Sequence, residues 1–179
     1  MEGEKDLEFK QIEDSKLDPK YFEPIYKKYF PAILRFIYWR IEDIEDCKEI
    51  ASIVFSKALF NIKKYNDRGF PFSSWLYRIA LNEITQYYRD KTKTRTISIS
   101  DKGVKSIAQE SGNNKTELIE VLYKALQYLS PEELILIELR FFEERPFSEV
   151  GEILSITENN AKVRTYRVLD KLKDIYNKL

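Results

Sequence analysis

The chain has 179 residues, with 30 lysines and arginines against 30 aspartates and glutamates, and no histidine. A hydrophobic share of 43% and a charged share of 34% are typical of a globular protein rather than a disordered one. The missing histidines exclude an imidazole base and a histidine zinc ligand, and the single cysteine, Cys47, cannot form an internal disulfide. We therefore expect no catalytic residue, no metal and no cofactor, and a cytoplasmic location.

Membrane and nucleotide-binding signals are also missing from the sequence. No stretch approaches the roughly 18–20 apolar residues that a bilayer span needs, and the acidic N-terminal segment lacks the layout of a signal peptide. None of the five glycines is clustered, which excludes glycine-rich phosphate-binding loops. Catalysis by carboxylates alone remains an alternative, although nearly all of the acidic residues fall on polar faces of helical patterns.

A tail and three helices are predicted for the first half of the chain. Residues 1–17 are acidic and weakly periodic, which indicates a mobile tail. Asp18 and Pro19 mark the start of a helix whose apolar spacing continues to Ile41, with a kink or break expected at Pro31. An acidic connector over residues 42–46 then leads to two further helices, the second of them over residues 75–91.

The second half of the chain begins with a polar segment that lacks helical periodicity. Residues 93–115 are polar, hold two of the five glycines and show no sustained period, which indicates a flexible linker. Helical spacing resumes at Thr116, and Ser130, Pro131 and Glu133 form a capping box that starts another helix. The predicted fold class is all-α, with a three- to four-helix bundle over residues 18–92 and a second small domain over residues 116–179.

The neutral total conceals an uneven distribution of charge. Residues 25–92 carry 12 basic and 8 acidic residues, and residues 93–115 carry 5 and 2. Residues 159–179 carry 6 and 2, whereas residues 1–24 carry 4 and 8 and residues 116–158 carry 3 and 10. Positive charge is gathered in two places, and each is a candidate footprint for a polyanion such as DNA.

Residues 147–173 have the layout of a helix-turn-helix, with the second helix running from about 158 to 176. A helical wheel predicts a buried arc formed by Ala161, Thr165, Val168, Leu169, Leu172, Ile175 and Tyr176. The opposite face carries amide and guanidinium groups, which can bond base edges in the major groove, and lysines that suit phosphates. The residues expected at a DNA duplex are Asn159, Asn160, Lys162, Val163, Arg164, Tyr166, Arg167 and Lys171.

Two blocks of sequence carry a family resemblance. The first runs from Ile25 to Lys91 and includes YKKYFPAILRFIYWRI, VFSKALFNI and FPFSSWLYRIALNEITQYYRDK; the second runs from Ala125 to Leu172 and contains the helix-turn-helix. Together they resemble the sigma-70 family of bacterial transcription initiation factors, in its extracytoplasmic-function group. The resemblance implies a chain that binds core RNA polymerase, recognises a −35 and a −10 promoter element, promotes melting, and is a possible target of an anti-sigma factor.

The resemblance also implies roles for residues of the first block. Melting exposes unstacked bases, which need a pocket, aromatic platforms and a basic path for the backbone. The residues expected at the −10 element are Lys63, Lys64, Asn66, Asp67, Arg68, Phe72, Arg78, Asn82, Gln86, Tyr88, Arg89 and Lys91, with Tyr87 as a further platform. The family's Asp-x-x-Gln-Glu polymerase-docking pattern is replaced here, and the matching residues are Asp46, Glu49, Ser52, Ile53 and Ser56.

Two other functions remain open from the sequence. A stand-alone DNA-binding regulator would use the helix-turn-helix but would need no single-strand pocket. A helical adaptor with incidental basic patches would lack salt-dependent affinity for DNA. In the second domain, Phe141 and Phe142 are candidates for a polymerase contact, but core packing is the simpler interpretation.

Overall fold

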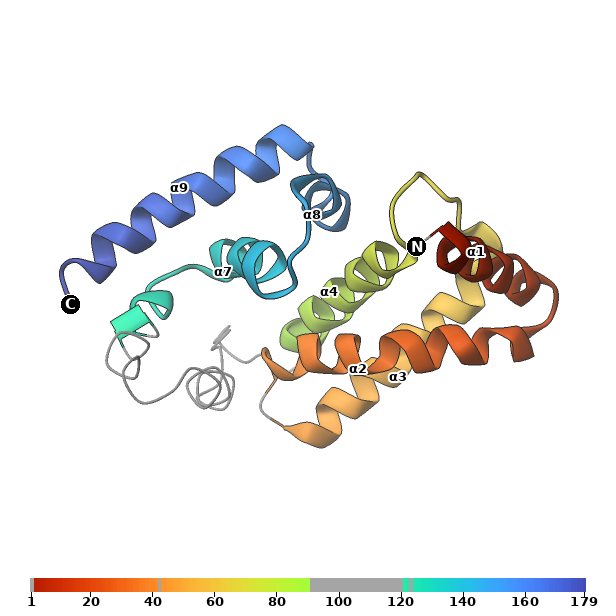
Figure 1. The fold of residues 1–179 in the computed structure, drawn as a ribbon. Helices are drawn as coiled ribbons and strands as arrows, with labels where there is room; N and C mark the ends of the chain where they lie inside the picture. The colour runs from red at the N-terminus through yellow and green to blue at the C-terminus, as the bar shows by residue number, and fades with distance from the viewer. Residues whose placement is uncertain (1, 42, 91–120, 123) are drawn as a thin grey trace, which may run out of the picture. The chain divides into compact units, whose positions relative to one another are not determined.

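The structure is a computed structural model that describes residues 2–41, 43–90, 121–122 and 124–179. Every regular element in these ranges is helical, which confirms the all-α prediction (Figure 1). The chain divides into two compact units, residues 1–91 and 92–179. The predicted linker over residues 93–115 lies outside the described residues. None of the helices within the described ranges is both long and apolar enough to cross a membrane.

The N-terminal unit is built around α3, which packs against both α2 and α4. Its elements are α1 (Glu2–Leu17), η1 (Pro19–Phe22), α2 (Glu23–Tyr38), α3 (Ile44–Asn61), η2 (Ile62–Lys64) and α4 (Phe72–Asp90). Side chains from the three long helices meet in the core, where the rings of Phe36 and Tyr77 lie edge to face with centroids 4.7 Å apart. Apolar residues at helical spacing on each helix supply this core, as the periodicity predicts.

The prediction of a mobile tail over residues 1–17 is wrong. This segment forms α1, which packs against η1, α2 and η2 (Figure 1). Ile12 is buried, the Tyr29 hydroxyl of α2 donates a hydrogen bond to the Glu8 carboxylate, and Lys28 lies 3.4 Å from the same carboxylate. These partners come from a different helix, so the segment's own weak apolar pattern could not indicate them.

Of the two outcomes predicted at Pro31, a kink or a break, the break is wrong, because α2 continues from Glu23 to Tyr38 through this residue. Pro31 lacks an N–H group, so the carbonyl of Lys27 loses its intrahelical partner. Both residues are exposed, and water can bond that carbonyl instead. The helix therefore tolerates the proline on its solvent side.

In the described part of the C-terminal unit, helical residues 121–122 and 124–126 precede four elements. These are α7 (Pro131–Ile137), the π-helical segment η3 (Glu138–Phe142), α8 (Phe147–Leu154) and α9 (Glu158–Tyr176). The predicted capping box is confirmed: the Ser130 side chain accepts from the Glu133 N–H, and the Glu133 side chain accepts from the Ser130 N–H. Phe141 is 49% exposed, so the interpretation that this residue packs in the core is wrong. The wider π-helical turn after Ile137 changes which residues face the core, and Phe141 faces outward.

Candidate nucleic-acid interface

The turn between α8 and α9 is fixed by its backbone. Ser155 adopts the left-handed conformation with φ of +56°, and the Ile156 N–H bonds the Gly151 carbonyl at 2.9 Å. A Cβ atom on Gly151 would lie 2.8 Å from the Ile156 carbonyl oxygen, so only glycine fits this close approach. Thr157 then caps α9, since its hydroxyl accepts the Asn160 N–H at 3.2 Å. The range of α9 agrees with the second helix predicted from about 158 to 176.

Helix α9 has one buried face and one exposed face. Four residues of the predicted arc are buried, namely Ala161, Thr165, Val168 and Leu172, and the other three are half-buried. Of the residues predicted to meet a duplex, Asn160 is half-buried and the rest are exposed: Asn159, Lys162, Val163, Arg164, Tyr166, Arg167 and Lys171. The fold therefore brings all of the predicted set except Asn160 to exposed positions on one helix.

The cations of this face differ in their surroundings. Within the part of the chain that the structure describes, Lys162, Arg164 and Arg167 have no ion-pair partner. The Lys171 ammonium instead lies 2.7 Å from the Glu133 carboxylate of α7. Partial burial opposes ionisation of Glu133, but hydrogen bonds from Lys171 and from the Ser130 backbone outweigh it and lower the pKa of this carboxyl. Lys171 is thus already neutralised within the protein.

Arg164 and Arg167 also line a pocket of about 390 Å³ between α7, the turn and α9. Its other walls include Glu132 and Glu133, together with the apolar side chains of Ile135, Leu136, Leu154, Ile156 and Val168. The two arginines therefore have an apolar surface beside their stems and carboxylates nearby. Such surroundings limit the freedom of the long side chains before any ligand arrives.

The loop between η2 and α4 is shaped by local and tertiary contacts. The Asp67 side chain accepts the Gly69 N–H at 2.7 Å, and Gly69 has a φ of +81°, which glycine adopts without strain. Below the loop, the rings of Tyr65, Phe72 and Trp75 have centroids 4.9 to 5.3 Å apart. Phe72 is only 2% exposed, so most of its ring is packed beneath the loop, and its contact with the −10 element stays a prediction.

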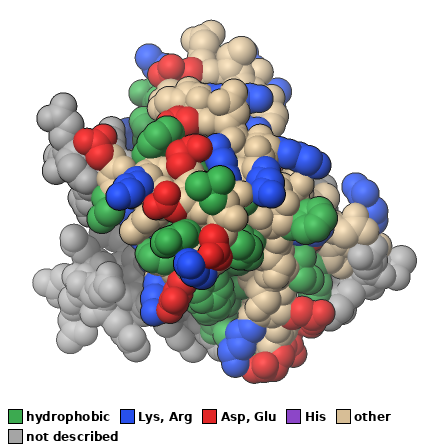
Figure 2. All heavy atoms as spheres, turned by 90° about the vertical axis from the view of Figure 1, so that its right-hand side faces the viewer, with side chains coloured by type: hydrophobic (Ala, Val, Ile, Leu, Met, Phe, Trp, Pro, Cys, Tyr) green, Lys and Arg blue, Asp and Glu red, His purple; other side chains and the backbone are tan. Residues whose placement is uncertain are grey.

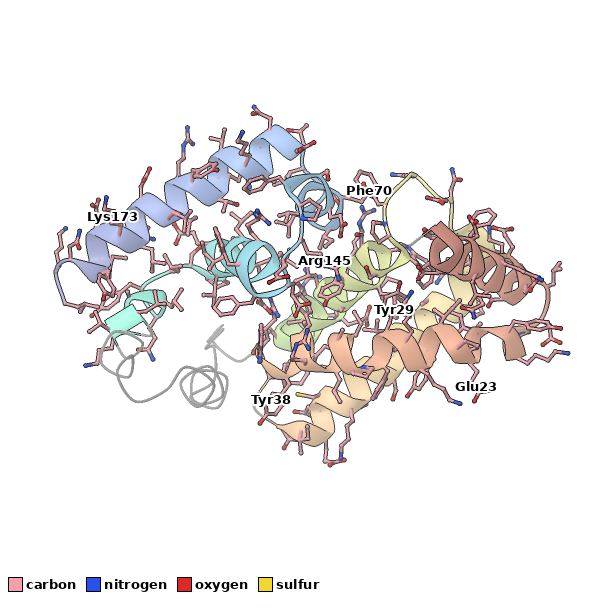
Figure 3. The ribbon with its side chains drawn as sticks, viewed as in Figure 1. Glu23, Tyr29, Tyr38, Phe70, Arg145 and Lys173 are labelled. Atoms are coloured by element: carbon pink, nitrogen blue, oxygen red, sulfur yellow. The ribbon has the colours of Figure 1, made fainter. Side chains whose placement is uncertain are left out.

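This loop and α1 form the walls of a second pocket, of about 280 Å³. Helix α1 contributes Glu8, Phe9 and Ile12, and the loop side contributes Tyr65, Asp67, Gly69, Phe70, Pro71 and Phe72. Phe70 lies on this loop, and Tyr29 on α2 holds Glu8 through its hydroxyl (Figure 3). The residues from α1 were missed by the sequence analysis, because the segment has too weak a period to indicate a packed helix.

The remaining residues predicted for the −10 element fall into two groups. Asn82, Gln86 and Arg89 are exposed on one stripe of α4, with Arg78 half-buried at its start. Lys63 and Lys64 on η2 and Asn66, Asp67 and Arg68 on the loop are also exposed. Tyr88 is half-buried and its hydroxyl donates to the Arg40 carbonyl, which ties this ring to the core rather than leaving it open to a base. Lys91 lies outside the described residues.

The residues predicted for polymerase docking lie on and near the outward face of α3. Glu49, Ser52 and Ser56 are exposed and Ile53 is half-buried. Asp46 is half-buried instead, and its carboxylate accepts the Tyr87 hydroxyl of α4 at 2.6 Å. Asp46 and Tyr87 therefore join two helices of the unit, a role that their separation of 41 residues hid from the sequence.

Neither metal nor thiol chemistry is indicated at these surfaces. No group of three or more potential metal-binding residues occurs in the described ranges. Cys47 is fully buried, and desolvation, with the negative charges of Asp46 and Asp43, raises the pKa of its thiol from 9.0 to about 11. On the face drawn in Figure 2, basic, acidic and hydrophobic side chains are interspersed, so contacts there depend on individual residues rather than on one continuous charge field.

Comparison with known proteins identifies the family of the chain. The model for "Sigma-70 region 2" matches residues 25–94, and the model for "Sigma-70, region 4" matches residues 125–174, so together they cover more than half of the chain. The chain belongs to the sigma-70 family. Among its relatives are the extracytoplasmic-function factors, and the helix-turn-helix described above lies within region 4.

Two relatives from Bacillus subtilis (strain 168) align over nearly their whole lengths. RNA polymerase sigma factor YlaC is 26% identical over 84% of this chain and 89% of its own, and ECF RNA polymerase sigma factor SigM is 26% identical over 87% and 95%. Among solved structures, CnrH in complex with the cytosolic domain of CnrY covers 94% of this chain and 96% of its own, with a TM-score of 0.65 and 16% identity. That likeness concerns the fold. Of the two Bacillus subtilis relatives, SigM is an extracytoplasmic-function factor by its name.

Proposed function

We propose that this sigma factor binds core RNA polymerase, reads a −35 element through α9 and a −10 element through the loop and α4, and promotes promoter melting. It works in the cytoplasm and has no catalytic chemistry of its own. The single observation that carries the proposal is the pairing of two different surfaces in one chain. One is an exposed basic and amide face on a capped helix, and the other is a concave loop followed by an exposed polar stripe.

The α9 face suits a duplex. A helix can enter the major groove, where guanidinium and amide groups make paired hydrogen bonds to guanine and adenine edges. Arg164, Arg167 and Asn159 supply these groups from exposed positions, and Lys162 suits a phosphate. We infer that these residues make the −35 contacts. Lys171 contributes less, because Glu133 neutralises its charge.

The loop and α4 suit a melted strand. Unstacked bases bind in recesses or on aromatic faces, while cations follow the backbone. The loop borders a pocket of about 280 Å³, Asn82 and Gln86 offer amides from the α4 stripe, and Lys63, Lys64, Arg68 and Arg89 supply exposed charge. A stand-alone DNA-binding regulator has no need of such a recess, which favours an initiation factor over that alternative.

A protein partner that restrains the factor is also part of the proposal. CnrH was solved in complex with the cytosolic domain of CnrY, and that fold spans 94% of the present chain. We infer that this chain also binds a protein partner, in keeping with the anti-sigma factor that its family resemblance implies.

Reconstitution tests the proposed function directly. The purified chain is added to core RNA polymerase with a genomic promoter library, and the 5′ ends of the transcripts are mapped. We expect a set of start sites that share a bipartite upstream sequence and that are missing with core polymerase alone. Transcripts identical with and without the chain would contradict the proposal. Equal loss of signal in a variant without Arg164 and in one without Lys173 would contradict the role given to the α9 face.

A further inference from the structure

The pocket between α7, the turn and α9 has the size and lining of a site for a small organic ligand. Its volume of about 390 Å³ lies within the range of such sites. Five of its nine lining residues have aliphatic side chains, so a ligand gains by burying apolar surface against them. The proposed DNA contacts of α9 use the two arginines of the pocket, Arg164 and Arg167, and leave its aliphatic walls without a role.

The aliphatic walls come from three places in the C-terminal unit. Ile135 lies on α7, Leu154 is the last residue of α8, and Ile156 belongs to the turn that follows. All three are half-buried, so part of each side chain remains accessible, whereas Leu136 and Val168 behind them are buried. Single accessible apolar residues are common on protein surfaces, but three of them around one hollow form an apolar site.

The charges of the pocket favour an anionic ligand. Glu132 and Glu133 face Arg164 and Arg167 across the lining, and Lys171 lies 2.7 Å from the Glu133 carboxylate, so the five groups leave one positive charge in excess. Glu133 is neutralised by Lys171, whereas neither arginine has an ion-pair partner among the residues that the structure describes. A guanidinium binds a carboxylate through two parallel hydrogen bonds, which makes these arginines the polar end of the site.

We propose that this pocket binds a small amphipathic monocarboxylate. Its apolar body packs against the aliphatic walls, and its carboxylate bonds Arg164 and Arg167. Inorganic phosphate would leave the aliphatic walls without a partner, and a neutral apolar molecule would leave the arginines without one. Since the proposed function assigns the same arginines to the −35 element, the ligand competes with promoter DNA. That competition alone rests on the proposed function, because the composition of the pocket does not depend on it.

Direct binding of a probe tests the site. Phenylbutyrate, a carboxylate on a short apolar chain with one aromatic ring, is titrated into the full-length chain without DNA and followed by calorimetry. Calorimetry is used because both tryptophans, Trp39 and Trp75, lie in the N-terminal unit and do not report on this pocket. Phenylbutanol has the same apolar body without the charge. We expect it to bind about tenfold more weakly, since the charge-assisted hydrogen bonds are lost.

Three substitutions locate the probe. Arg164→Gln and Arg167→Gln should each weaken phenylbutyrate binding by about tenfold, whereas Lys173→Gln, an exposed cation of α9 outside the pocket lining, should not change it. Ile135→Trp fills the hollow from α7 and should abolish binding. Far-UV circular dichroism checks that each variant folds. The arginine variants alter exposed positions, so they test the site even where the larger side chain at position 135 lowers stability.

Promoter binding then tests the competition. Phenylbutyrate should weaken binding of the wild-type holoenzyme to a promoter fragment in proportion to the occupancy of the pocket. Holoenzyme with Ile135→Trp keeps both arginines, so it should bind the fragment as the wild type does and should not respond to the probe.

The outcomes separate the site from the proposed function. Absence of phenylbutyrate binding, equal affinity for phenylbutanol, or unchanged binding in Ile135→Trp would each overturn the inference. Probe binding that leaves promoter binding unaffected would overturn the competition. A holoenzyme that binds no promoter fragment, while the chain still binds phenylbutyrate through Arg164 and Arg167, would contradict the proposed function and support the site.

Discussion

The two units present their proposed DNA-binding residues in different ways. In the C-terminal unit, residues close together in sequence position the recognition helix: Thr157 caps α9, and Gly151 allows the turn to close against α8. In the N-terminal unit, the loop before α4 shares its pocket with α1, a segment far from it in sequence. A duplex offers a regular groove that a preformed helix can enter, whereas an unstacked base needs a recess with several walls.

The largest expected effect comes from a substitution that disrupts the turn between α8 and α9. In Gly151→Val, the new side chain collides with the Ile156 carbonyl, and we expect a loss of about 1–3 kcal/mol of stability in this unit. Far-UV circular dichroism should show an earlier unfolding transition, while tryptophan fluorescence, which reports the N-terminal unit, stays unchanged. Ser148→Ala on the same helix is the control, and an equal shift in both signals would contradict independent units.

The second prediction removes single contacts from α9 without disturbing its fold. Arg164→Ala and Arg167→Ala should each weaken binding to a −35 duplex by about 1–3 kcal/mol, because a guanidinium pair to a base edge is lost. Lys173→Ala, an exposed cation near the other end of the same helix (Figure 3), should have little effect. Affinities come from holoenzyme binding to promoter fragments, and normal initiation in both arginine variants would refute the assignment of the recognition face.

The third prediction concerns the N-terminal unit. Asn82→Ala should raise the free energy of open-complex formation by about 1 kcal/mol, the scale of one amide hydrogen bond, and should leave duplex binding nearly intact. Permanganate reactivity of −10 thymines measures the melted fraction. Asn61→Ala is the control, since that amide bonds the Lys57 carbonyl on α3 instead. Normal melting in Asn82→Ala would count against the α4 stripe as a base-reading surface.

The smallest expected effect sharpens the distinction between paired and unpaired cations on α9. Glutamine at position 133 keeps the capping box but loses the charge that neutralises Lys171. Glu133→Gln should strengthen DNA binding by a few tenths of a kcal/mol and steepen its salt dependence by up to one counterion. The pKa of Glu133 is lowered from the ordinary value of 4.5. The stability that its ionised carboxylate contributes is therefore fully present above pH 4.5 and is lost only as pH falls through the lowered pKa. Measurements at pH 7 thus compare an ionised glutamate with a neutral glutamine.

Local signals explain which parts of the fold the sequence predicts. Ser130 with Pro131, and the turn from Ser155 to Thr157, are complete within a few residues, and the helices that they start were predicted correctly. The helical segment over residues 2–17 was missed because its stabilising partners, such as Tyr29, lie on another helix. Local patterns indicate secondary structure, but tertiary packing decides whether a weakly periodic segment is a helix.

The same limit applies to the candidate sites. A helical wheel was sufficient for α9, where burial alternates with a fixed period. It could not show that Asp46 is held by Tyr87, that Tyr88 bonds the Arg40 carbonyl, or that Phe72 lies beneath the loop. These side chains meet partners that folding supplies, so their roles follow from the structure rather than from residue type.

The most direct test of the division of labour compares two promoter templates that differ only in base pairing at −10. Holoenzyme with wild type, Asn82→Ala or Arg164→Ala initiates on a fully paired template and on one with a pre-melted −10 segment. The account predicts that pre-melting reduces the Asn82→Ala defect and leaves the Arg164→Ala defect unchanged. Equal response of the two defects to pre-melting would contradict separate duplex-reading and strand-capturing units.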